Sequence, residues 1–339
     1  MGKYNNIAVF YGSDSSEWEI SLRSGEYTAS RIDDTQYNIY EIFARFGKWE
    51  LAALRKKDSM RVTFPEGARP LVDRNDFSVK VYGEKIKFDY AYVIQHGKPG
   101  ENGLLQGYFE MLGIPFSSCG AFVSSVIFDK YSCKCYLRDA GIVKMTPDTF
   151  IRKGNTDMEA FCRETVEKLG LPVFVKPTDG GSSFGITKVK AAEDLPSAIA
   201  YAFTESDTVI VEKAVSGREL TCAVYCDSEG VKSLPVIEIV TDNEYFDYDA
   251  KYNGQSREIC PAEIPDSLAA HVKDTTERIY RHFGCKGVVR MDYIAAEDGL
   301  YFLEVNTIPG MTSASLVPKM VRAAGLDMTD FLSSIIENS

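Results

Sequence analysis

The chain has 339 residues, 45% hydrophobic and 26% charged, which suits a folded protein of two or three domains. Its formal net charge of −11 gives no overall electrostatic reason to expect binding to nucleic acid or to an anionic membrane. No apolar run approaches the roughly 18 residues of a membrane-spanning helix, and the N-terminus has no signal-peptide core. We therefore expect a cytoplasmic protein with no nucleic-acid or membrane partner.

The first region, residues 1–120, predicts an α/β domain of Rossmann-like type with a mainly parallel sheet. Strands are expected at residues 7–11, 38–43 and 90–95, and helices from about Ser21 and over residues 103–112. Ligands of such sheets bind at the carboxyl ends of the strands, so the loops at residues 12–19 and 96–103 should lie on one rim.

Two further regions, residues 121–213 and 214–339, mix helices and strands without a repeat. Helices are expected at residues 124–140, 158–169, 192–203 and 268–283 and at the C-terminus, and strands at residues 172–176, 186–189, 208–213, 219–226 and 236–240. The polar, aromatic stretch at residues 241–258 is long enough to act as a lid over a site.

The cysteines and histidines argue against a structural zinc site. The eight cysteines have no Cys-x-x-Cys spacing, and none of the three histidines clusters with them. We expect reduced thiols, as in a cytosolic protein.

A hairpin near the C-terminus carries the strongest chemical signal. Residues 287–306 predict two strands joined at an Asp-Gly turn near Asp298. If the turn centres there, Asp292 lies opposite Glu304 and Arg290 lies opposite Asn306, all on one face. Carboxylate and amide oxygens of this kind suit Mg²⁺ held together with substrate phosphates.

The opposite face of this hairpin, with Met291, Leu303 and Val305, should be core. The alternative for the polar face is a solvated surface with cross-strand ion pairs.

A second signal is the loop at residues 177–185, which joins two predicted strands. Its glycines allow the backbone N–H groups to converge, and Ser182 and Ser183 add hydroxyl donors, so it can bind phosphate oxygens. Lys176, at the end of the preceding strand, adds a charge on the same phosphates. The alternative is an ordinary hairpin loop.

Four further residues allow two interpretations each. Glu212 and Glu219, near the connector at residues 213–215, could help bind a nucleoside, or they are solvated acids at strand ends. Glu17 is either a ligand-binding acid or an acid that complements a helix dipole. His96 is either catalytic or structural.

Taken together, these segments resemble the D-alanine–D-alanine ligases of the ATP-grasp superfamily over nearly the whole chain. The motifs that carry the resemblance are Ser16-Glu17-x-Glu19-x-Ser21, His96-Gly97, Gly100-Glu101-x-Gly103, Asp129-Lys130, Val175-Lys176-Pro177, Gly181-Ser182-Ser183-x-Gly185, Glu212-Lys213, Lys251-Tyr252, Arg290-x-Asp292 and Glu304-x-Asn306, followed by Gly310 and Ser315-Leu316.

The resemblance implies an ATP-grasp fold, α/β in class and α+β in its ATP-binding part. It also implies ligation of two D-alanines with ATP through an acyl phosphate, for peptidoglycan synthesis, in a homodimer. The cofactors would be two Mg²⁺ or Mn²⁺ ions on Asp292, Glu304 and Asn306.

The other roles follow from the same resemblance. The catalytic residues would be Glu17, Ser182, Tyr252, Arg290 and Gly310; the D-alanine-binding residues His96, Ser315 and Leu316; and the ATP-binding residues Lys130, Lys176, Ser183, Glu212, Lys213, Val215, Glu219 and Lys251.

Three alternatives remain beside this function. The first is a ligase that takes D-serine or D-lactate second, which Leu316 and Tyr252 respectively disfavour through the resemblance. The second is an ATP-grasp ligase for another amino acid or peptide. The third, of another class, is a non-catalytic ATP-binding regulatory protein.

Overall fold

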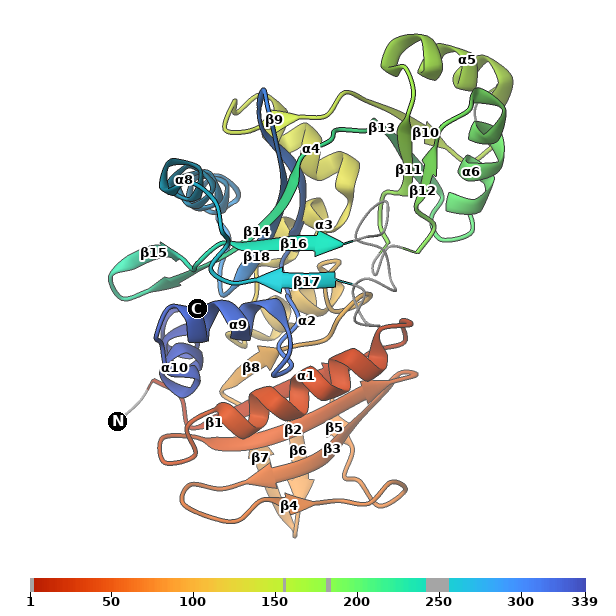
Figure 1. Cartoon of the computed structure of the whole chain (residues 1–339). Helices are drawn as coiled ribbons and strands as arrows, with labels where there is room; N and C mark the ends of the chain where they lie inside the picture. Colours follow the sequence, from red (N-terminus) through yellow and green to blue (C-terminus); the bar gives the residue numbers. More distant parts are fainter. Residues whose placement is uncertain (1–2, 155–156, 181–183, 242–255) are drawn as a thin grey trace.

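The computed structural model describes residues 3–154, 157–180, 184–241 and 256–339 (Figure 1). Figure 1 shows a body at the N-terminal end, a large central sheet, and a lobe that projects from it. The mixed α/β class that the sequence predicts is confirmed.

The N-terminal body is built on a five-stranded sheet in the order β4-β3-β2-β1-β8. Its elements are β1 (Asn6–Gly12), α1 (Trp18–Arg31), β2 (Asn38–Arg45), β3 (Lys48–Arg55), β4 (Val62–Thr63), β8 (Tyr90–Val93) and α2 (Leu104–Leu112). β2 and β8 run parallel to β1, as predicted, and put the loops after β1 and β8 on one rim. β1, which lies between β2 and β8, is buried without a break from Ile7 to Gly12, as expected of a strand covered on both faces.

Strands that the sequence analysis did not predict extend this body. β3 pairs antiparallel with β2, and β4 pairs antiparallel with β3. A separate sheet contains β5 (Val72–Asp73), β6 (Ser78–Val81) and β7 (Glu84–Lys87).

The projecting lobe contains a four-stranded antiparallel sheet in the order β10-β13-β11-β12. Its elements are β10 (Asp148–Arg152), α5 (Met158–Leu169), β11 (Val173–Pro177), β12 (Thr187–Val189), η1 (Ala192–Asp194), α6 (Leu195–Ala202) and β13 (Thr208–Lys213). Val173, Val175, Val209 and Val211 form a core with α5 and α6 on one face. Side chains alternate along a strand, so Lys176 and Glu212 lie on the other face.

The large sheet has the order β17-β16-β14-β18-β19-β9, with β15 paired to β14. Its elements are β9 (Lys144–Met145), β14 (Arg218–Asp227), β15 (Gly230–Ser233), β16 (Ile237–Thr241), β17 (Ser256–Ile259), α8 (Asp266–Phe283), β18 (Val289–Ala296) and β19 (Gly299–Asn306).

Helices cover both faces of this sheet. On one face Leu220, Cys222 and Val224 share a core with α8, α3 (Ala121–Phe128) and α4 (Lys130–Arg138). On the other face Ala223 and Tyr225 share a core with α9 (Leu316–Ala323), α10 (Met328–Asn338) and the N-terminal sheet. The C-terminal helices therefore join the large sheet to the N-terminal body.

Two helix predictions are wrong in detail. The helix expected at residues 124–140 is broken at Asp129, whose carboxylate accepts a hydrogen bond from Ser132 N at 2.7 Å and starts α4 anew. The single terminal helix is in fact the pair α9 and α10. The division into three domains stays a prediction, and β9, from the second predicted region, pairs with β19 in the third.

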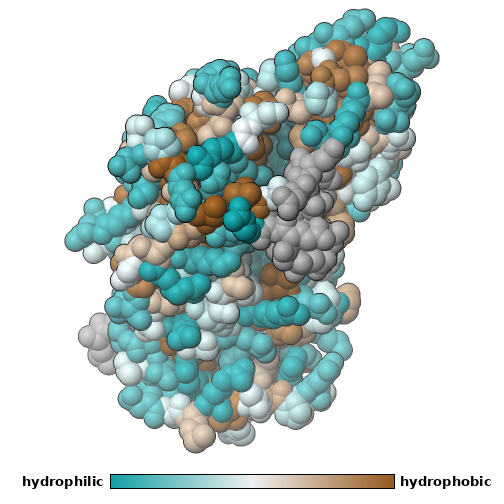
Figure 2. Space-filling model, viewed as in Figure 1, coloured by the Kyte–Doolittle hydropathy of each residue, from teal (hydrophilic) through white to brown (hydrophobic). Residues whose placement is uncertain are grey.

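The surface fits the composition. Figure 2 shows a mainly hydrophilic face on which apolar residues form separate patches. None of the helices in the described residues is both long and apolar enough to cross a membrane.

Candidate active site

A cavity of about 350 Å³ lies where the N-terminal rim, α4, the β18–β19 hairpin and the loop before α9 meet. It brings together predicted site residues that are up to 299 positions apart in the chain, Glu17 and Leu316 being the outermost. The predicted residues on its wall are Glu17, His96, Lys130, Arg290, Glu304, Asn306, Gly310, Ser315 and Leu316.

The hairpin has the predicted register. Asp292 pairs with Glu304 and Arg290 pairs with Asn306, and the turn follows Ala296, which pairs with Gly299. The predicted polar patch is thus a real feature of the fold.

The expected core position of Leu303 is wrong. The register shifts between Asp292 and Tyr293, where a β-bulge opposes one extra residue of β19. Phe302 therefore takes the core position, with 1% of its surface exposed, whereas Leu303 lines the cavity. Met291 and Val305 are buried, as predicted.

Asp292 is a buried carboxylate whose two oxygens are held by several donors. Arg290 donates from Nε to Oδ1 and from Nη2 to Oδ2, each at 2.9 Å. Thr221 donates to Oδ1 at 2.6 Å and Asn306 Nδ2 donates to Oδ2 at 3.2 Å. The ion pair runs along β18 rather than across the hairpin, and it fixes the guanidinium at the cavity wall.

The same face supplies donors for a divalent cation. Asp292 and Glu304 are register partners, and Asn306 lies two residues farther along β19 on the same face. Two carboxylates and an amide are hard oxygen donors, which fit Mg²⁺ or Mn²⁺. Among the described residues no group of three or more His, Cys, Asp or Glu could hold a metal by itself. Three side chains would fill only part of the octahedral coordination of Mg²⁺ and would leave positions for substrate oxygens or water.

On the N-terminal rim, His96 joins the body to the loop before α9. Its Nδ1 lies 3.1 Å from Ile308 O and its Nε2 lies 3.2 Å from Ser24 Oγ. Burial lowers the pKa of His96, against the opposing effect of Glu17. The imidazole is therefore neutral at neutral pH and acts in the site as a hydrogen-bonding group.

Glu17 and Glu101 form an acidic part of the same wall. Glu17 is the N-cap residue of α1, so it lies at a helix N-terminus and also in the cavity. Glu101 Oε2 accepts a hydrogen bond from Gly97 N at 2.7 Å. Burial, and then the charge of Glu17, raise the pKa of Glu101 to about 8. Two neighbouring carboxyl groups of this kind suit an ammonium group.

Of the two described lysines that are expected to bind phosphate, Lys130 lines the opposite side of the cavity and Lys176 lies outside its wall. Lys130 Nζ donates to Gly180 O at 2.9 Å and lies 3.7 Å from Glu304 Oε2. Lys176 Nζ lies 2.6 Å from Glu212 Oε2. Burial by itself lowers the pKa of Lys176, but Glu212 outweighs that effect and the pKa is raised.

The remaining ATP-binding predictions lie outside the cavity wall. In the described part of the chain, the lining residues do not include Lys176, Glu212, Lys213, Val215 or Glu219. Lys213 ends β13 beside Glu212, and Glu219 lies on β14 two residues from Thr221, the partner of Asp292.

The loop before α9 presents a helix N-terminus to the cavity. Ser315 is the N-cap residue of α9, and its Oγ accepts a hydrogen bond from Thr312 N at 3.0 Å. Unpaired N–H groups and the helix dipole favour an anion at such an end. Ser315, Leu316 and the nearby Gly310 are thus placed to meet a carboxylate or an oxyanion.

Four predicted residues lie outside the described residues: Ser182, Ser183, Lys251 and Tyr252. Most of the predicted lid, residues 241–258, lies there too, and its last three residues begin β17.

The sequence analysis included Ser21 in a motif of the resemblance but missed two other supporting residues, Ser24 and Thr221. Ser21 Oγ donates to Ile94 O at 2.8 Å and accepts from Gly12 N at 3.1 Å, which joins the two rim loops. Ser24 and Thr221 hold His96 and Asp292. Ser21 and Ser24 lie three residues apart on one face of α1, and small polar residues at that spacing were a usable signal. Thr221 had none.

Comparisons with known proteins agree with this geometry. Two family models match the chain, "D-ala D-ala ligase N-terminus" over residues 6–119 and "D-ala D-ala ligase C-terminus" over residues 136–337. The D-alanine–D-alanine ligase of Phocaeicola vulgatus is 47% identical over 333 residues, which cover 98% of each chain. That of Parabacteroides distasonis is also 47% identical, over 98% of this chain and 97% of its own.

Solved structures are similar over the same length. The VanG D-Ala:D-Ser ligase from Enterococcus faecalis has a TM-score of 0.86 and 32% identity, covering 98% of this chain and 99% of its own. The D-alanyl-alanine synthetase A from Vibrio cholerae has a TM-score of 0.85 and 27% identity, covering 99% and 98%. The fold is the ATP-grasp fold that the sequence predicts. The chain belongs to the D-alanine–D-alanine ligase family.

Proposed function

We propose that this enzyme joins two D-alanines with ATP, through an acyl phosphate, to supply the dipeptide for peptidoglycan. The observation that carries the proposal is a cavity whose wall combines an acidic rim, the lysine Lys130 and a helix N-terminus. These are matched to an ammonium group, a nucleotide and a carboxylate. Family membership supports the ligase reaction.

The first D-alanine binds at the N-terminal rim. Its ammonium group is received by Glu17, with Glu101 beside it and neutral His96 as a hydrogen-bonding neighbour. Its carboxylate then faces Arg290, whose position is fixed by Asp292. This arrangement points the nucleophilic oxygen toward the phosphates.

In the first chemical step, that carboxylate oxygen attacks the γ-phosphorus of ATP and ADP leaves. Lys130 and Lys176 bind the α- and β-phosphates, and Arg290 stabilises the negative charge on the transferred group. Asp292, Glu304 and Asn306 would hold Mg²⁺ or Mn²⁺, two ions in all. When bound, these ions neutralise phosphate charge.

In the second step, the amine nitrogen of the second D-alanine attacks the acyl carbon, loses a proton, and phosphate leaves. The second D-alanine lies at the N-terminus of α9, where Ser315 and the first turn meet its carboxylate and Leu316 contacts it. The N–H of Gly310 stabilises the oxyanion of the tetrahedral intermediate.

The nucleoside of ATP binds between the lobe and the large sheet. Glu212 and the backbone of Lys213 and Val215 bind the adenine, and Glu219 binds the ribose. Ser183 and Lys251 bind phosphate, and Ser182 and Tyr252 join Glu17 in a hydrogen-bonded triad that closes the site.

The enzyme acts as a cytoplasmic homodimer. The cytoplasm supplies ATP, and all eight cysteines are free thiols. Exposed Leu104 and Met111 on α2 and Phe122 on α3 offer an apolar surface for the second subunit.

The test is ATP-dependent phosphate release with D-alanine, followed by product analysis. D-Alanyl-D-alanine as main product supports the proposal. A competition between D-alanine and D-serine matters, because one of the similar structures is a D-Ala:D-Ser ligase. Preferred incorporation of D-serine or D-lactate would show that the proposed second substrate is wrong. Nucleotide binding without turnover would favour the alternative of a non-catalytic regulatory protein.

A further inference from the structure

Lys134 on α4 is a buried charged side chain that the proposed reaction does not use. Only 1% of its side chain is exposed. Its Nζ donates to Thr146 O at 3.1 Å and to Thr146 Oγ1 at 2.7 Å, and it lies 3.1 Å from Asp148 Oδ2. It also pairs with Oε1 of Glu212. All of these contacts of the ammonium group are therefore inside the protein.

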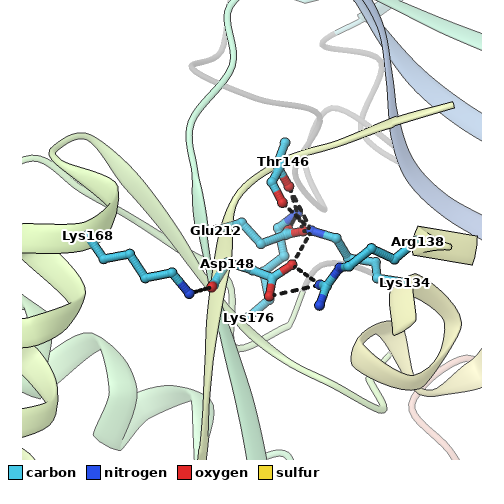
Figure 3. Close-up of polar contacts among 7 residues, drawn as sticks. All are labelled: Lys134, Arg138, Thr146, Asp148, Lys168, Lys176 and Glu212. Carbon is cyan, nitrogen blue, oxygen red and sulfur yellow. Dashed lines mark hydrogen bonds and ion pairs between the residues drawn. The ribbon is translucent and has the colours of Figure 1, made fainter. Parts of the chain in front are cut away.

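These contacts form a chain of alternating charges, shown in Figure 3. Arg138 pairs with Asp148 at 2.9 Å, Asp148 with Lys134, Lys134 with Glu212, and Glu212 with Lys176 at 2.6 Å. The chain runs from a half-exposed arginine at one end to a phosphate-binding lysine at the other.

The backbone places these groups together. Asp148 and Glu212 are register partners on β10 and β13. Lys176 lies two residues from Phe174, the β11 partner of Glu212, and so is its diagonal neighbour on one face. Lys134 follows Lys130 by four residues on α4, so both lysines lie on the same side of that helix.

The two carboxylate oxygens of Glu212 pair with different lysines. Oε1 pairs with Lys134 and Oε2 pairs with Lys176. Burial by itself raises the pKa of Glu212, but the two ammonium groups outweigh that effect and hold its pKa well below the ordinary value. The carboxylate is thus ionised, and Lys134, which the proposed reaction does not use, helps to fix its direction.

Stability alone is a poor reason for this arrangement. Burying an ion pair costs desolvation free energy, and apolar residues of similar volume often stabilise a protein as well or better. An ionic chain that ends at a ligand-binding lysine can instead act by positioning it.

We propose that Lys134 is a positioning residue for nucleotide binding. It holds one oxygen of Glu212 and so prevents Glu212 from turning both oxygens to Lys176, which leaves Lys176 able to bind the ATP phosphates. This deepens the proposed function and rests on the ATP-binding roles of Glu212 and Lys176.

The first test replaces Lys134 by methionine, which keeps the length and removes the charge. Two balanced pairs remain, Arg138 with Asp148 and Glu212 with Lys176. The expected result is a rise of about tenfold or more in KM for ATP, the scale seen when an orienting partner of a bound group is lost. KM for D-alanine should stay within about twofold, and kcat should change less than KM for ATP.

The matched control is Arg138→Met, which removes the other cation on Asp148 but leaves Lys134 on Glu212. KM for ATP should stay near the wild-type value. If Lys134 were needed only for the fold, its loss would lower the fraction of active enzyme. That would reduce kcat and would not raise KM for ATP selectively. Equal KM effects in the two variants would therefore overturn the proposal.

Lys134→Gln is the second variant, because its shorter amide can still donate hydrogen bonds inside the protein. It should show the same selective loss of ATP affinity. Both variants with wild-type KM for ATP would overturn the proposal, and so would failure of both to fold, which would assign Lys134 to folding.

Binding of ADP with Mg²⁺, measured by calorimetry, separates this proposal from the proposed reaction. A wild-type protein that binds ADP but does not turn over D-alanine would refute the reaction only. Weaker ADP binding by Lys134→Met would still support the positioning role, and unchanged ADP binding would contradict it.

Discussion

Glu304→Gln separates the metal-binding role of the hairpin from its role in the fold. Glu304 is a partly exposed residue of β19, with 29% of its side chain accessible. Its ion pair with Lys130 spans 3.7 Å, and pairs of this exposure contribute about 1 kcal/mol or less. Glutamine keeps the shape of the side chain, so the melting temperature should fall by at most about 2–4 °C.

The rate should respond very differently. Losing one carboxylate from the proposed cation site removes charge stabilisation in phosphoryl transfer, and loss of one such group costs about 10²–10³-fold in kcat. The assay is phosphate release with saturating ATP, D-alanine and Mg²⁺, with circular dichroism melts on the same preparations.

The matched control is Glu297→Gln, the same change at the exposed turn of the same hairpin. It should keep the wild-type rate and melting temperature. Loss of one charge-stabilising group should leave about a hundredth of the wild-type rate or less. If Glu304→Gln retains more than about a tenth of that rate, the metal assignment is wrong. A much larger loss of melting temperature would instead mean that Glu304 belongs to the fold.

Three further outcomes follow from the same geometry. Arg290→Met should lower the free energy of unfolding by about 3–5 kcal/mol in urea titrations, because buried Asp292 loses its compensating cation. The double variant with Asp292→Asn should recover part of the lost free energy of unfolding. The pKa of Glu101 is raised by burial and Glu17 from 4.5 to about 8, so its contribution to stability is present below pH 4.5 and is lost as the pH rises through 8. Glu101→Gln should remove this part of the pH dependence from a series of thermal melts. Gly287→Ala should sharply lower the melting temperature, because φ is +64° and the new Cβ would lie 1.8 Å from Ser117 O.

Each has a result that would contradict it. An unchanged urea midpoint for Arg290→Met would contradict the first prediction. A Glu101→Gln variant that keeps the wild-type slope of stability against pH would contradict the second. For Gly287 the contradicting result is an alanine variant that melts within about 2 °C of the wild type, less than 1 kcal/mol in a chain of this size.

The polar face of the hairpin was predictable because its causes are local. An Asp-Gly turn and a side-chain period of two fix which residues oppose each other, and Asp292 and Glu304 do. The bulge was not predictable, because Phe302 and Leu303 are both apolar and either could face the core. Only packing against the rest of the large sheet decides between them.

The supporting residues depend on contacts between distant segments. Thr221 binds Asp292 from a strand 71 residues away in the chain, and Lys134 binds Glu212 from 78 residues away. Nothing in the neighbouring sequence marks either residue. The strands β3 to β7 were missed for another reason. β4 to β7 are only two to four residues long, and the charged residues of β3 and β7 weaken the apolar alternation.

The break at Asp129, which the apolar pattern concealed, is the feature that places Lys130 at the cavity and Lys134 against Glu212. Capping by Asp129 starts α4 at Lys130, and Lys130 N donates to Thr178 O at 2.7 Å while its Nζ donates to Gly180 O. The start and the rotation of α4 are thus fixed against the turn that follows β11. One helical turn later Lys134 meets Glu212. In the proposed function, α4 thus binds phosphate directly through Lys130 and positions Lys176 indirectly through Lys134 and Glu212. A continuous helix would have had no such anchor at Lys130, and the interruption is therefore part of the site.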